Sequence, residues 1–481
     1  MSGAGDGGPR LAGTTLAVGL ATGIGYLGFL ARDILTARLF GLGEAVALYQ
    51  LASYLPLFLA STLAGPLYSS LVPEITMRRE AGGPDAAWLG RLAGAVSLAF
   101  SVAAAVSLAL VAGQGFAAGR QPSFLLLAGL AAAVLAASGA VVMRNALLAV
   151  HDRPVAAAAA QALVPLVAIP VLLAARSSGA FALAVGALAG QAANLLAVRI
   201  LVARAGIATG PARWSWPPPL EPGFPARYGA LVLAGLLLYA YQPIGVVLAA
   251  RLGEPAVAAL AIGGKATVFL NGLAWVGVAY VVLPRFAQLA ARGSREAAAG
   301  DLADRLYAGT LAAMPVSLAL AMLAEPIVRL MFEGGAFAAA DTVVVARVMA
   351  WGLLQLPCFV VVMLYLKFAI AHQVPARVAW ALLPGTLAGL LAASALMDGF
   401  GVAGIALGGT IGIGVSAFLL VAGVSHRLPA RERLRLAGLL VLYALMAGAM
   451  EAGHWPLAGA AAAAVGLVWV SGRCARPGAG S

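Results

Sequence analysis

The feature that most constrains this chain is a series of about fourteen apolar stretches, each long enough to cross a bilayer as a helix. A spanning helix needs about 20 mostly apolar residues, because the hydrocarbon core is about 30 Å thick. The stretches cover residues 12–34, 46–74, 88–112, 124–149, 155–175, 180–203, 228–250, 256–284, 303–324, 342–371, 377–396, 401–424, 436–451 and 455–472. They predict an all-α, multi-pass membrane protein.

The composition excludes an ordinary soluble protein. Hydrophobic residues make up 62% of the chain and charged residues 10%, against about 45–50% and about 25% in soluble domains. Too few charges are present to cover a soluble surface. The net charge of +12 therefore indicates membrane topology, and we expect no nucleic-acid partner. The first apolar stretch has no clear cleavage site, so we expect it to be a permanent span.

The arginines alternate between the two sides of the predicted membrane. With the N-terminus inside, the inner loops and tails hold nineteen arginines, whereas the outer loops hold five, namely Arg38, Arg120, Arg176, Arg251 and Arg329. Cytoplasmic loops of membrane proteins carry an excess of Lys and Arg. We therefore expect both termini to be cytoplasmic.

A duplicated unit is indicated on either side of a Pro-rich linker. "RLFGLGE" at 38–44 is matched by "RLGE" at 251–254, and "VVMRNALLAVHDRPV" at 141–155 parallels "VVMLYLKFAIAHQVPARV" at 361–378. Repeats of six helices in the same order are typical of transporters with a substrate site between two lobes. The alternative is chance similarity among Ala/Leu-rich helices.

The duplication predicts two pseudo-symmetric six-helix lobes followed by two C-terminal helices. The predicted divisions are an N-terminal lobe at 1–204, a cytoplasmic linker at 205–227, a C-terminal lobe at 228–425, and two appended helices with a tail at 426–481.

Six cations remain within the spans after the arginines assigned to loops and span ends are removed: Arg32, Arg144, Arg199, Lys265, Arg347 and Lys367. An ionisable group at membrane depth is costly, so it usually faces a cavity or a partner. Lys265 is the strongest candidate, because it stands well inside its span. Arg32 is either a cavity residue or a partner of the adjacent Asp33. Arg144, Arg199, Lys367 and also Arg347 have the alternative of reaching to the membrane surface.

An excess of buried cations over carboxylates favours an anionic substrate. Apart from acidic residues at span ends, such as Glu74, Asp33 is the candidate carboxylate within a predicted span. Export coupled to cations usually needs a buried acidic group. Arg and Lys bind phosphate or pyrophosphate instead. Gln242 and Asn271 are further candidates for the same cavity, with ordinary hydrogen bonding between helices as the alternative.

No catalytic motif is visible in the sequence. The Gly/Lys phosphate-binding loop of ATPases is missing, and the four histidines do not have metal-ligand spacing. We therefore expect neither enzyme activity nor a cofactor.

Several segments resemble the MurJ/MviN family: "GFLARDILTARLFGLGE" at 28–44, "YLPLFLASTLAGPLYSSLVPEI" at 54–75, "NALLAVHDRPVAAA" at 145–158, "GVAYVVLPRFAQLAARG" at 277–293 and "LAEPIVRLMFEGGAFAAADT" at 323–342. The resemblance implies fourteen spans in a bacterial inner membrane. It also implies that the protein flips undecaprenyl-pyrophosphate-linked sugars, such as lipid II, from the cytoplasmic to the outer leaflet. The implied mechanism is alternating access.

The expected partners are a lipid-linked anionic saccharide and membrane lipids. Envelope-synthesis enzymes are further candidate partners. By resemblance, Arg32 matches a family arginine, and Lys265 stands where the family has a cavity arginine. Other charged positions of the family are replaced here, at Tyr26, Ala47, Ala60, Ser61 and Gly65. These departures make another polyprenyl-linked saccharide, such as an exopolysaccharide unit, a credible cargo.

Three alternatives stay open. A cation-coupled multidrug exporter of the same superfamily would need a buried acidic cluster. A membrane glycosyltransferase or ligase would need catalytic carboxylates and a large outer loop. A non-transporting scaffold in envelope assembly would fit the replaced charged positions.

Overall fold

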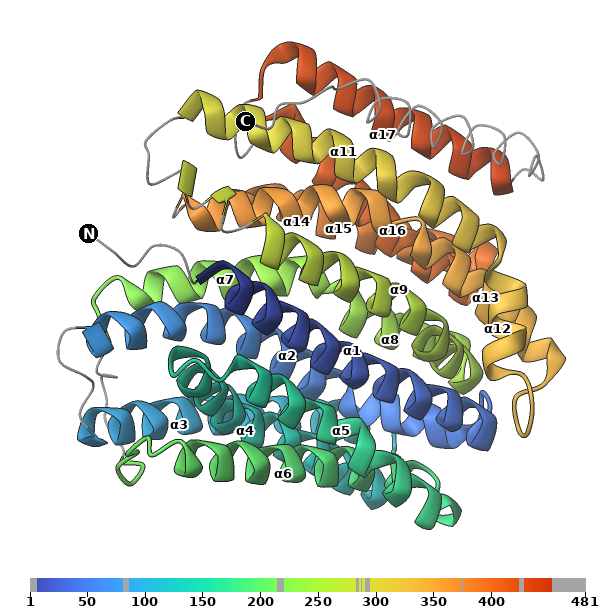
Figure 1. Ribbon diagram of the computed structural model, residues 1–481. Helices are drawn as coiled ribbons and strands as arrows, with labels where there is room; N and C mark the ends of the chain where they lie inside the picture. Colours follow the sequence, from blue (N-terminus) through green and yellow to red (C-terminus); the bar gives the residue numbers. More distant parts are fainter. Residues whose placement is uncertain are drawn as a thin grey trace. The chain divides into compact units, whose positions relative to one another are not determined.

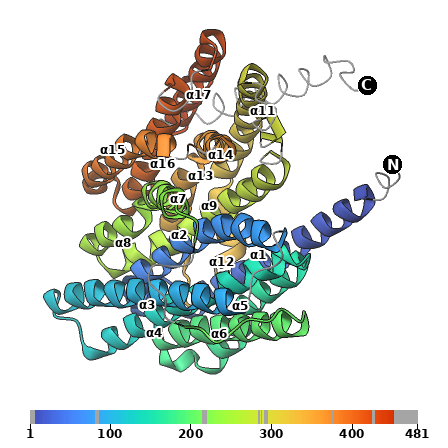
Figure 2. The same ribbon diagram turned by 90° about the vertical axis from the view of Figure 1, so that its left-hand side faces the viewer.

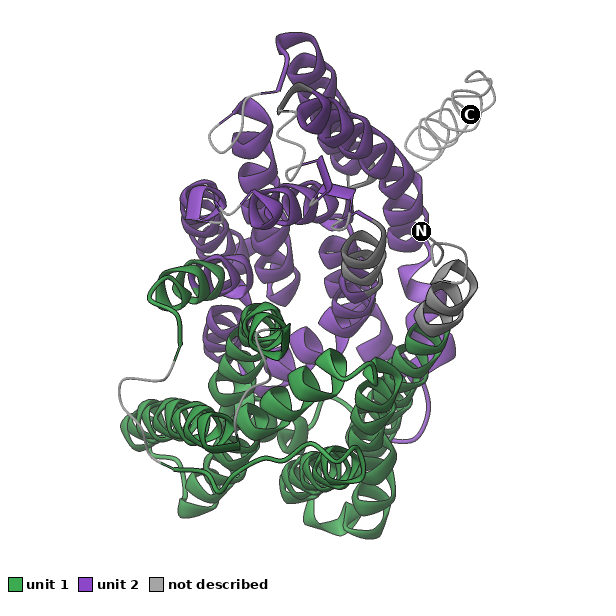
Figure 3. Ribbon diagram, turned by 60° about the vertical axis from the view of Figure 1, so that its left-hand side comes forward, with its two compact units in different colours: residues 1–232 green, residues 233–481 purple. Residues whose placement is uncertain are grey.

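A computed structural model of the chain describes residues 7–80, 86–213, 220–282, 285–286, 288–289, 295–372, 374, 376–423 and 428–451. In this part of the chain the structure is helical, with one isolated β-bridge between Gly334 and Phe337. The chain divides into two compact units, residues 1–232 and 233–481, which Figure 3 shows in different colours.

Unit 1 contains six long helices joined by short connections (Figure 1). They are α1 (Gly7–Phe40), α2 (Glu44–Glu80), α3 (Ala86–Ala117), α4 (Pro122–Val150), α5 (Pro154–Ala174) and α6 (Ala180–Arg204), with a short 3₁₀ turn at Arg176–Ser178. α4 packs against α2, α3 and α6, and α5 packs against α1 and α6 (Figure 2). α7 (Phe224–Tyr239) crosses from unit 1 into unit 2.

Unit 2 contains the remaining described helices. They are α8 (Tyr241–Leu252), α9 (Glu254–Val281), α11 (Arg295–Met322), α12 (Ala324–Phe332), α13 (Ala339–Leu353), α14 (Leu356–Ala371), α15 (Ala376–Phe400), α16 (Val402–Ala422) and α17 (Ala430–Glu451). Its largest apolar core is built around α14, in which Phe359, Met363 and Tyr365 are almost fully buried.

The prediction of an all-helical, multi-pass membrane protein is confirmed. Ten helices in the described residues are long and apolar enough to cross a membrane, with α7 and α8 counted together as Phe224–Leu252. The bent pair α13 and α14 makes eleven if it is one span. The predicted last span at 455–472 and the core of the Pro-rich linker at 214–219 lie outside the described residues.

Proline and glycine mark several helix ends. Pro122 and Pro154 stand in the first turns of α4 and α5, where a missing N–H costs little because first-turn donors have no partner within the helix. Gly179 precedes α6 with φ of 56°, a backbone conformation that favours glycine. These residues belong to the short turns that connect α3, α4, α5 and α6.

Small residues allow α15 and α16 to approach closely. A Cβ atom placed on Gly412 would lie 2.8 Å from the Gly385 carbonyl oxygen and 3.0 Å from the Gly389 Cα. Lipid tails are as apolar as leucine, so membrane helices associate largely through such close van der Waals packing. Glycines of this Gly-rich chain thus form the interface between α15 and α16.

Two of the predicted spans are broken helices. Residues 228–250 form α7 and α8 with a break at Ala240, and residues 342–371 form α13 and α14, which are bent by 40°. Pro243 and Pro357 follow the breaks, and a proline removes the N–H that would bond the carbonyl four residues earlier.

Side chains from other helices bond the backbone near these breaks. Thr386 Oγ1 donates to the Leu237 carbonyl at 2.7 Å, and Thr410 Oγ1 donates to the Trp351 carbonyl at 2.7 Å. The Tyr443 hydroxyl donates to the Leu354 carbonyl at 2.8 Å. In an apolar environment an unpaired carbonyl is expensive, so these bonds stabilise both breaks.

Candidate functional site

Arg32 in unit 1 is held by its neighbour in the sequence. Its Nη2 lies 2.7 Å and its Nε 3.2 Å from Asp33 Oδ1. The guanidinium carbon lies 5.3 Å from the centre of the Phe29 ring, one turn earlier on α1. The side chains of Arg32 and Asp33 are 21% and 15% exposed. The structure therefore brings together two predicted site residues as a half-buried ion pair.

Tyr49 of α2 completes the surroundings of this pair. It lies close enough to interact electrostatically with both Arg32 and Asp33. Its backbone carbonyl accepts a hydrogen bond of 2.6 Å from Ser53 Oγ. The Arg32 and Asp33 charges are thus placed at the contact of α1 with α2, and one side of the guanidinium is already occupied by the carboxylate.

Lys265 is half-buried on α9 in unit 2. It stands eleven residues (265 − 254) after the first residue of that helix, which corresponds to about 16 Å at 1.5 Å per residue. Val268, one turn further on the same face, is 50% exposed. The lysine is therefore placed near the middle of α9, whose 28 residues extend about 42 Å and so exceed the hydrocarbon core of about 30 Å.

Asn271 points to a different side of α9 from Lys265. Six residues separate the two, so their side chains leave the helix axis in directions about 120° apart. Asn271 shares its face with Thr267, whose hydroxyl would lie 2.6 Å from a Cβ placed on Gly352 of α13. The Asn271 side chain is 7% exposed, and its Oδ1 has no hydrogen-bond partner. Its position favours a contact between α9 and the bent pair α13 and α14.

Gln242 belongs to a polar group at the two helix breaks. It is half-buried at the start of α8. The Tyr241 hydroxyl lies next to the side-chain amides of Gln242 and Gln355. Gln355 stands at the break between α13 and α14, is 2% exposed, and has an unpartnered Oε1. The structure thus joins Gln242 to a residue that was not a predicted candidate.

Arg347 lies on the exposed face of α13, beside Val343 and Val344, which are 50% and 41% exposed. Among the residues that the structure describes, no carboxylate pairs with it. Its surroundings are therefore apolar and open, unlike those of Arg32.

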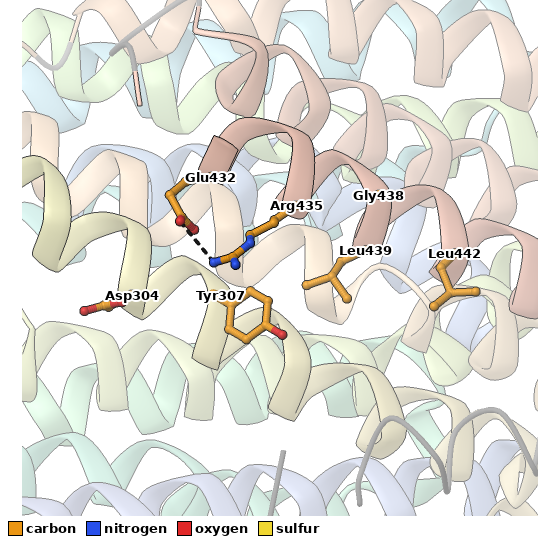
Figure 4. Close-up of a pocket in the computed structure, with 7 residues that line it drawn as sticks. All are labelled: Asp304, Tyr307, Glu432, Arg435, Gly438, Leu439 and Leu442. Atoms are coloured by element: carbon orange, nitrogen blue, oxygen red, sulfur yellow. Dashed lines mark hydrogen bonds and ion pairs between the residues drawn. The ribbon is translucent and has the colours of Figure 1, made fainter. Parts of the chain in front are cut away.

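A pocket of about 570 Å³ lies between α11 and α17 in unit 2 (Figure 4). It is lined by Asp304, Tyr307, Glu432, Arg435, Gly438, Leu439 and Leu442. Arg435 Nη1 lies 3.2 Å from Glu432 Oε1, so its charge is already compensated. None of the predicted site residues lines this pocket.

Two residues of these polar groups were missed by the sequence analysis. Gln355 carried a usable signal, since it is a polar residue in an apolar run two residues before Pro357, much as Gln242 directly precedes Pro243. Tyr49 carried none, because its proximity to Arg32 depends on how α1 and α2 pack.

The comparison with known families gives a consistent result. Residues 36–458 match the family model described as Lipid II flippase MurJ. A relative from Rhizobium meliloti (strain 1021), described as a probable lipid II flippase MurJ, is 29% identical over 377 residues, which cover 74% of this chain and 69% of the relative. The match includes Lys265 and begins four residues (36 − 32) after Arg32.

Known structures share the fold. A lipid II flippase MurJ in an inward closed conformation matches with a TM-score of 0.73 and 17% identity, covering 95% of this chain and 98% of the other. An inward-facing transporter of the multidrug resistance MATE family, from the MOP superfamily, matches with a TM-score of 0.63 and 14% identity, covering 88% and 98%.

The family model covers most of the chain. Of the two structures compared, the MurJ flippase has the higher TM-score. The members of this family are transporters of the bacterial inner membrane, and membership supports flipping of a lipid-linked saccharide. This chain belongs to the lipid II flippase MurJ family.

Proposed function

We propose that this protein flips a polyprenyl-pyrophosphate-linked saccharide from the cytoplasmic to the outer leaflet by alternating access, with lipid II as the first candidate cargo. The observation that carries the proposal is the presence of cations at membrane depth in a chain of the MurJ family. A pyrophosphate is the part of such a cargo that is most costly to move through hydrocarbon. Fixed cations lower that cost.

Each unit supplies one cation in this proposal. Arg32 stands eight residues (40 − 32) before the end of α1, and Lys265 stands eleven after the start of α9. These offsets correspond to about 12 Å and about 16 Å. In the predicted topology both of these helix ends lie on the outer side of the membrane. Asp33 would orient the Arg32 guanidinium and leave its other N–H groups for phosphate oxygens.

The other predicted residues have supporting roles in the proposal. Gln242 would offer hydrogen bonds to the saccharide or the phosphates, and Arg347 would add a third cation. Asn271 is buried on a side of α9 about 120° from Lys265, so a direct contact with the cargo would require α9 to rotate.

The proposed topology places both termini in the cytoplasm and counts fourteen spans in two six-helix lobes plus two helices. Its support is the distribution of arginines in the sequence and the span number of the family. Envelope-synthesis enzymes would supply the cargo on one side and consume it on the other.

The test is complementation in bacterial cells depleted of their own lipid II flippase, with outward movement of lipid II as the readout. We expect the wild-type chain to restore it and Lys265→Ala to lower its rate about tenfold or more, because losing one charge-assisted phosphate contact costs roughly 1.5–3 kcal/mol. Lys265→Arg should keep most activity. Arg329→Gln is the matched control, since it removes a charge from an exposed surface ion pair, which contributes little.

The outcomes separate the alternatives. Restoration that persists in Lys265→Ala and Arg32→Ala would show that the cations are not the site. Failure by a well-expressed wild-type chain would exclude lipid II and direct the assay to other polyprenyl-linked saccharides. Resistance to cationic drugs without lipid II movement would identify a multidrug exporter, which shares this fold. Activity in none of these assays would leave the scaffold role.

A further inference from the structure

Two arginines outside the proposed substrate site stand at the same level on neighbouring helices of unit 1. Gln191 Nε2 of α6 donates to Ser138 Oγ of α4 at 3.1 Å, which sets the register of the two helices. Arg144 follows Ser138 by six residues (144 − 138), and Arg199 follows Gln191 by eight (199 − 191). α4 and α6 run in the same direction, so both arginines lie about 9–12 Å beyond that bond.

The two guanidinium groups interact unfavourably with each other. Arg144 lies close enough to Arg199 for a direct electrostatic interaction between their positive charges. Arg144 Nη1 donates to its own helix, to the Ala140 carbonyl at 2.9 Å. Within the described ranges, no carboxylate forms an ion pair with either arginine. Two like charges at membrane depth without a carboxylate favour an external anion beside them.

The pair stands on a surface of unit 1 that other helices leave open. α4 packs Val142 and Met143 into the core shared with α2 and α3. Arg144 instead lies on the same face of α4 as Ala133 and Leu126. Both of these residues are exposed, and Leu126 is 58% exposed. These residues are spaced by whole turns of the helix. This is the outward face of α4.

Arg199 lies on the outward face of α6. Its neighbours Leu196 and Ile200 are 60% and 42% exposed. α5 packs on another face of α6, where a Cβ placed on Gly186 would lie 3.2 Å from the Ala168 carbonyl oxygen. Exposed leucine and isoleucine side chains beside an arginine fit acyl chains below a headgroup.

The depth of the pair fits a lipid phosphate. Arg144 is six residues (150 − 144) before the end of α4, and Arg199 is five (204 − 199) before the end of α6, or about 9 Å and about 7.5 Å. Long arginine side chains reach from this depth to the headgroup level. Basic sites between helices on the cytoplasmic side bind anionic lipid headgroups, and arginine binds phosphate with two parallel hydrogen bonds.

We propose that Arg144 and Arg199 together bind the phosphate of an anionic phospholipid, in the leaflet where α4 and α6 end. The acyl chains lie along the outward faces of α4 and α6, against Leu196 and Ile200. The arginine distribution predicts that this leaflet is the cytoplasmic one. The site is separate from Arg32 and Lys265 and does not depend on which cargo is carried.

The test is native mass spectrometry of the full-length protein in neutral detergent, titrated with phosphatidylglycerol and, in parallel, with zwitterionic phosphatidylcholine. We expect tight binding of phosphatidylglycerol alone, weakened about tenfold in Arg144→Gln and in Arg199→Gln, since one charge-assisted contact is lost. Arg204→Gln is the control, because it removes an exposed charge from the same end of α6 and should leave binding within about twofold of wild type.

A second readout separates binding from folding. Without lipid, Arg144→Gln should unfold at the wild-type temperature or higher, because it removes a like-charge repulsion. Added phosphatidylglycerol should raise that temperature in the wild type and much less in the variant. Equal weakening in Arg204→Gln, unchanged binding in both site variants, or equal stabilisation by inorganic phosphate would each overturn the proposal.

Discussion

At the scale of single residues, each polar side chain in an apolar environment needs a partner, and the partner defines what that side chain does. Arg32 has Asp33 beside it, and the two form a half-buried pair. Tyr443 of α17 is 4% exposed and bonds the backbone at the break between α13 and α14. In the first arrangement Asp33 occupies one side of the guanidinium, whereas in the second the hydroxyl is bonded to the Leu354 carbonyl and to Ser317 Oγ.

Tyr443 provides a test of how that break is stabilised. Tyr443→Phe removes the 2.8 Å bond to the Leu354 carbonyl and the 2.5 Å contact with Ser317 Oγ. We expect a loss of about 1–3 kcal/mol in stability, because buried partners stay unpaired. Thermal unfolding in detergent measures it. Tyr228→Phe is the control, since that hydroxyl makes one long bond of 3.4 Å. Equal effects of the two variants would contradict this account.

At the scale of elements, α15 and α16 of unit 2 approach each other through small residues that allow close backbone packing. α16 is apolar all round, yet Gly412 faces the backbone of α15, whereas Gly414 has nothing within 4 Å of its Cβ position. The two glycines are two residues apart in one helix. Helix propensity therefore differs little between them, and the close approach of α15 to Gly412 is the main difference.

This pair of glycines predicts unequal responses to the same substitution. Gly412→Ala places a methyl group 2.8 Å from the Gly385 carbonyl oxygen, so α15 and α16 must separate. We expect a loss of about 1–3 kcal/mol from overpacking. Gly414→Ala should be neutral or stabilising, because alanine favours the helix by about 1 kcal/mol. Thermal unfolding of the purified proteins compares them, and a more damaging Gly414→Ala would refute the interface.

At the scale of the whole molecule, the chain is a multi-pass helical membrane protein of the MurJ family. Its proposed orientation depends on arginine counts, and two exposed positions can test it. Ala336 lies in the turn between α12 and α13, and Ala208 follows α6. The predicted topology puts Ala336 outside and Ala208 inside.

Cysteine labelling in intact cells checks that orientation. In a chain with Cys358→Ser and Cys474→Ser, Ala336→Cys should react with a membrane-impermeant maleimide. Ala208→Cys should react only after the cells are permeabilised. Positively charged loops are retained in the cytoplasm, which is the reason for this expectation. The reverse pattern would place both termini outside and would reverse the proposed direction of transport.

The sequence by itself determined the class of the protein, because a 20-residue apolar window measures a local transfer free energy. It also located Arg32, Asp33 and Lys265 within spans, and its motifs carried the family resemblance. It predicted one span each at 228–250 and 342–371 but not the break inside each, although Pro243 and Pro357 stand directly after those breaks.

The tertiary structure alone decided which side chains face each other. It placed Tyr49 beside Arg32 and brought Arg144 level with Arg199 on an outward surface. Helices rich in Ala, Gly and Leu are similarly apolar on every face, so their sequences contain little periodicity that marks the packed side. The packed side follows from contacts between residues far apart in the chain, and these exist only in the folded protein.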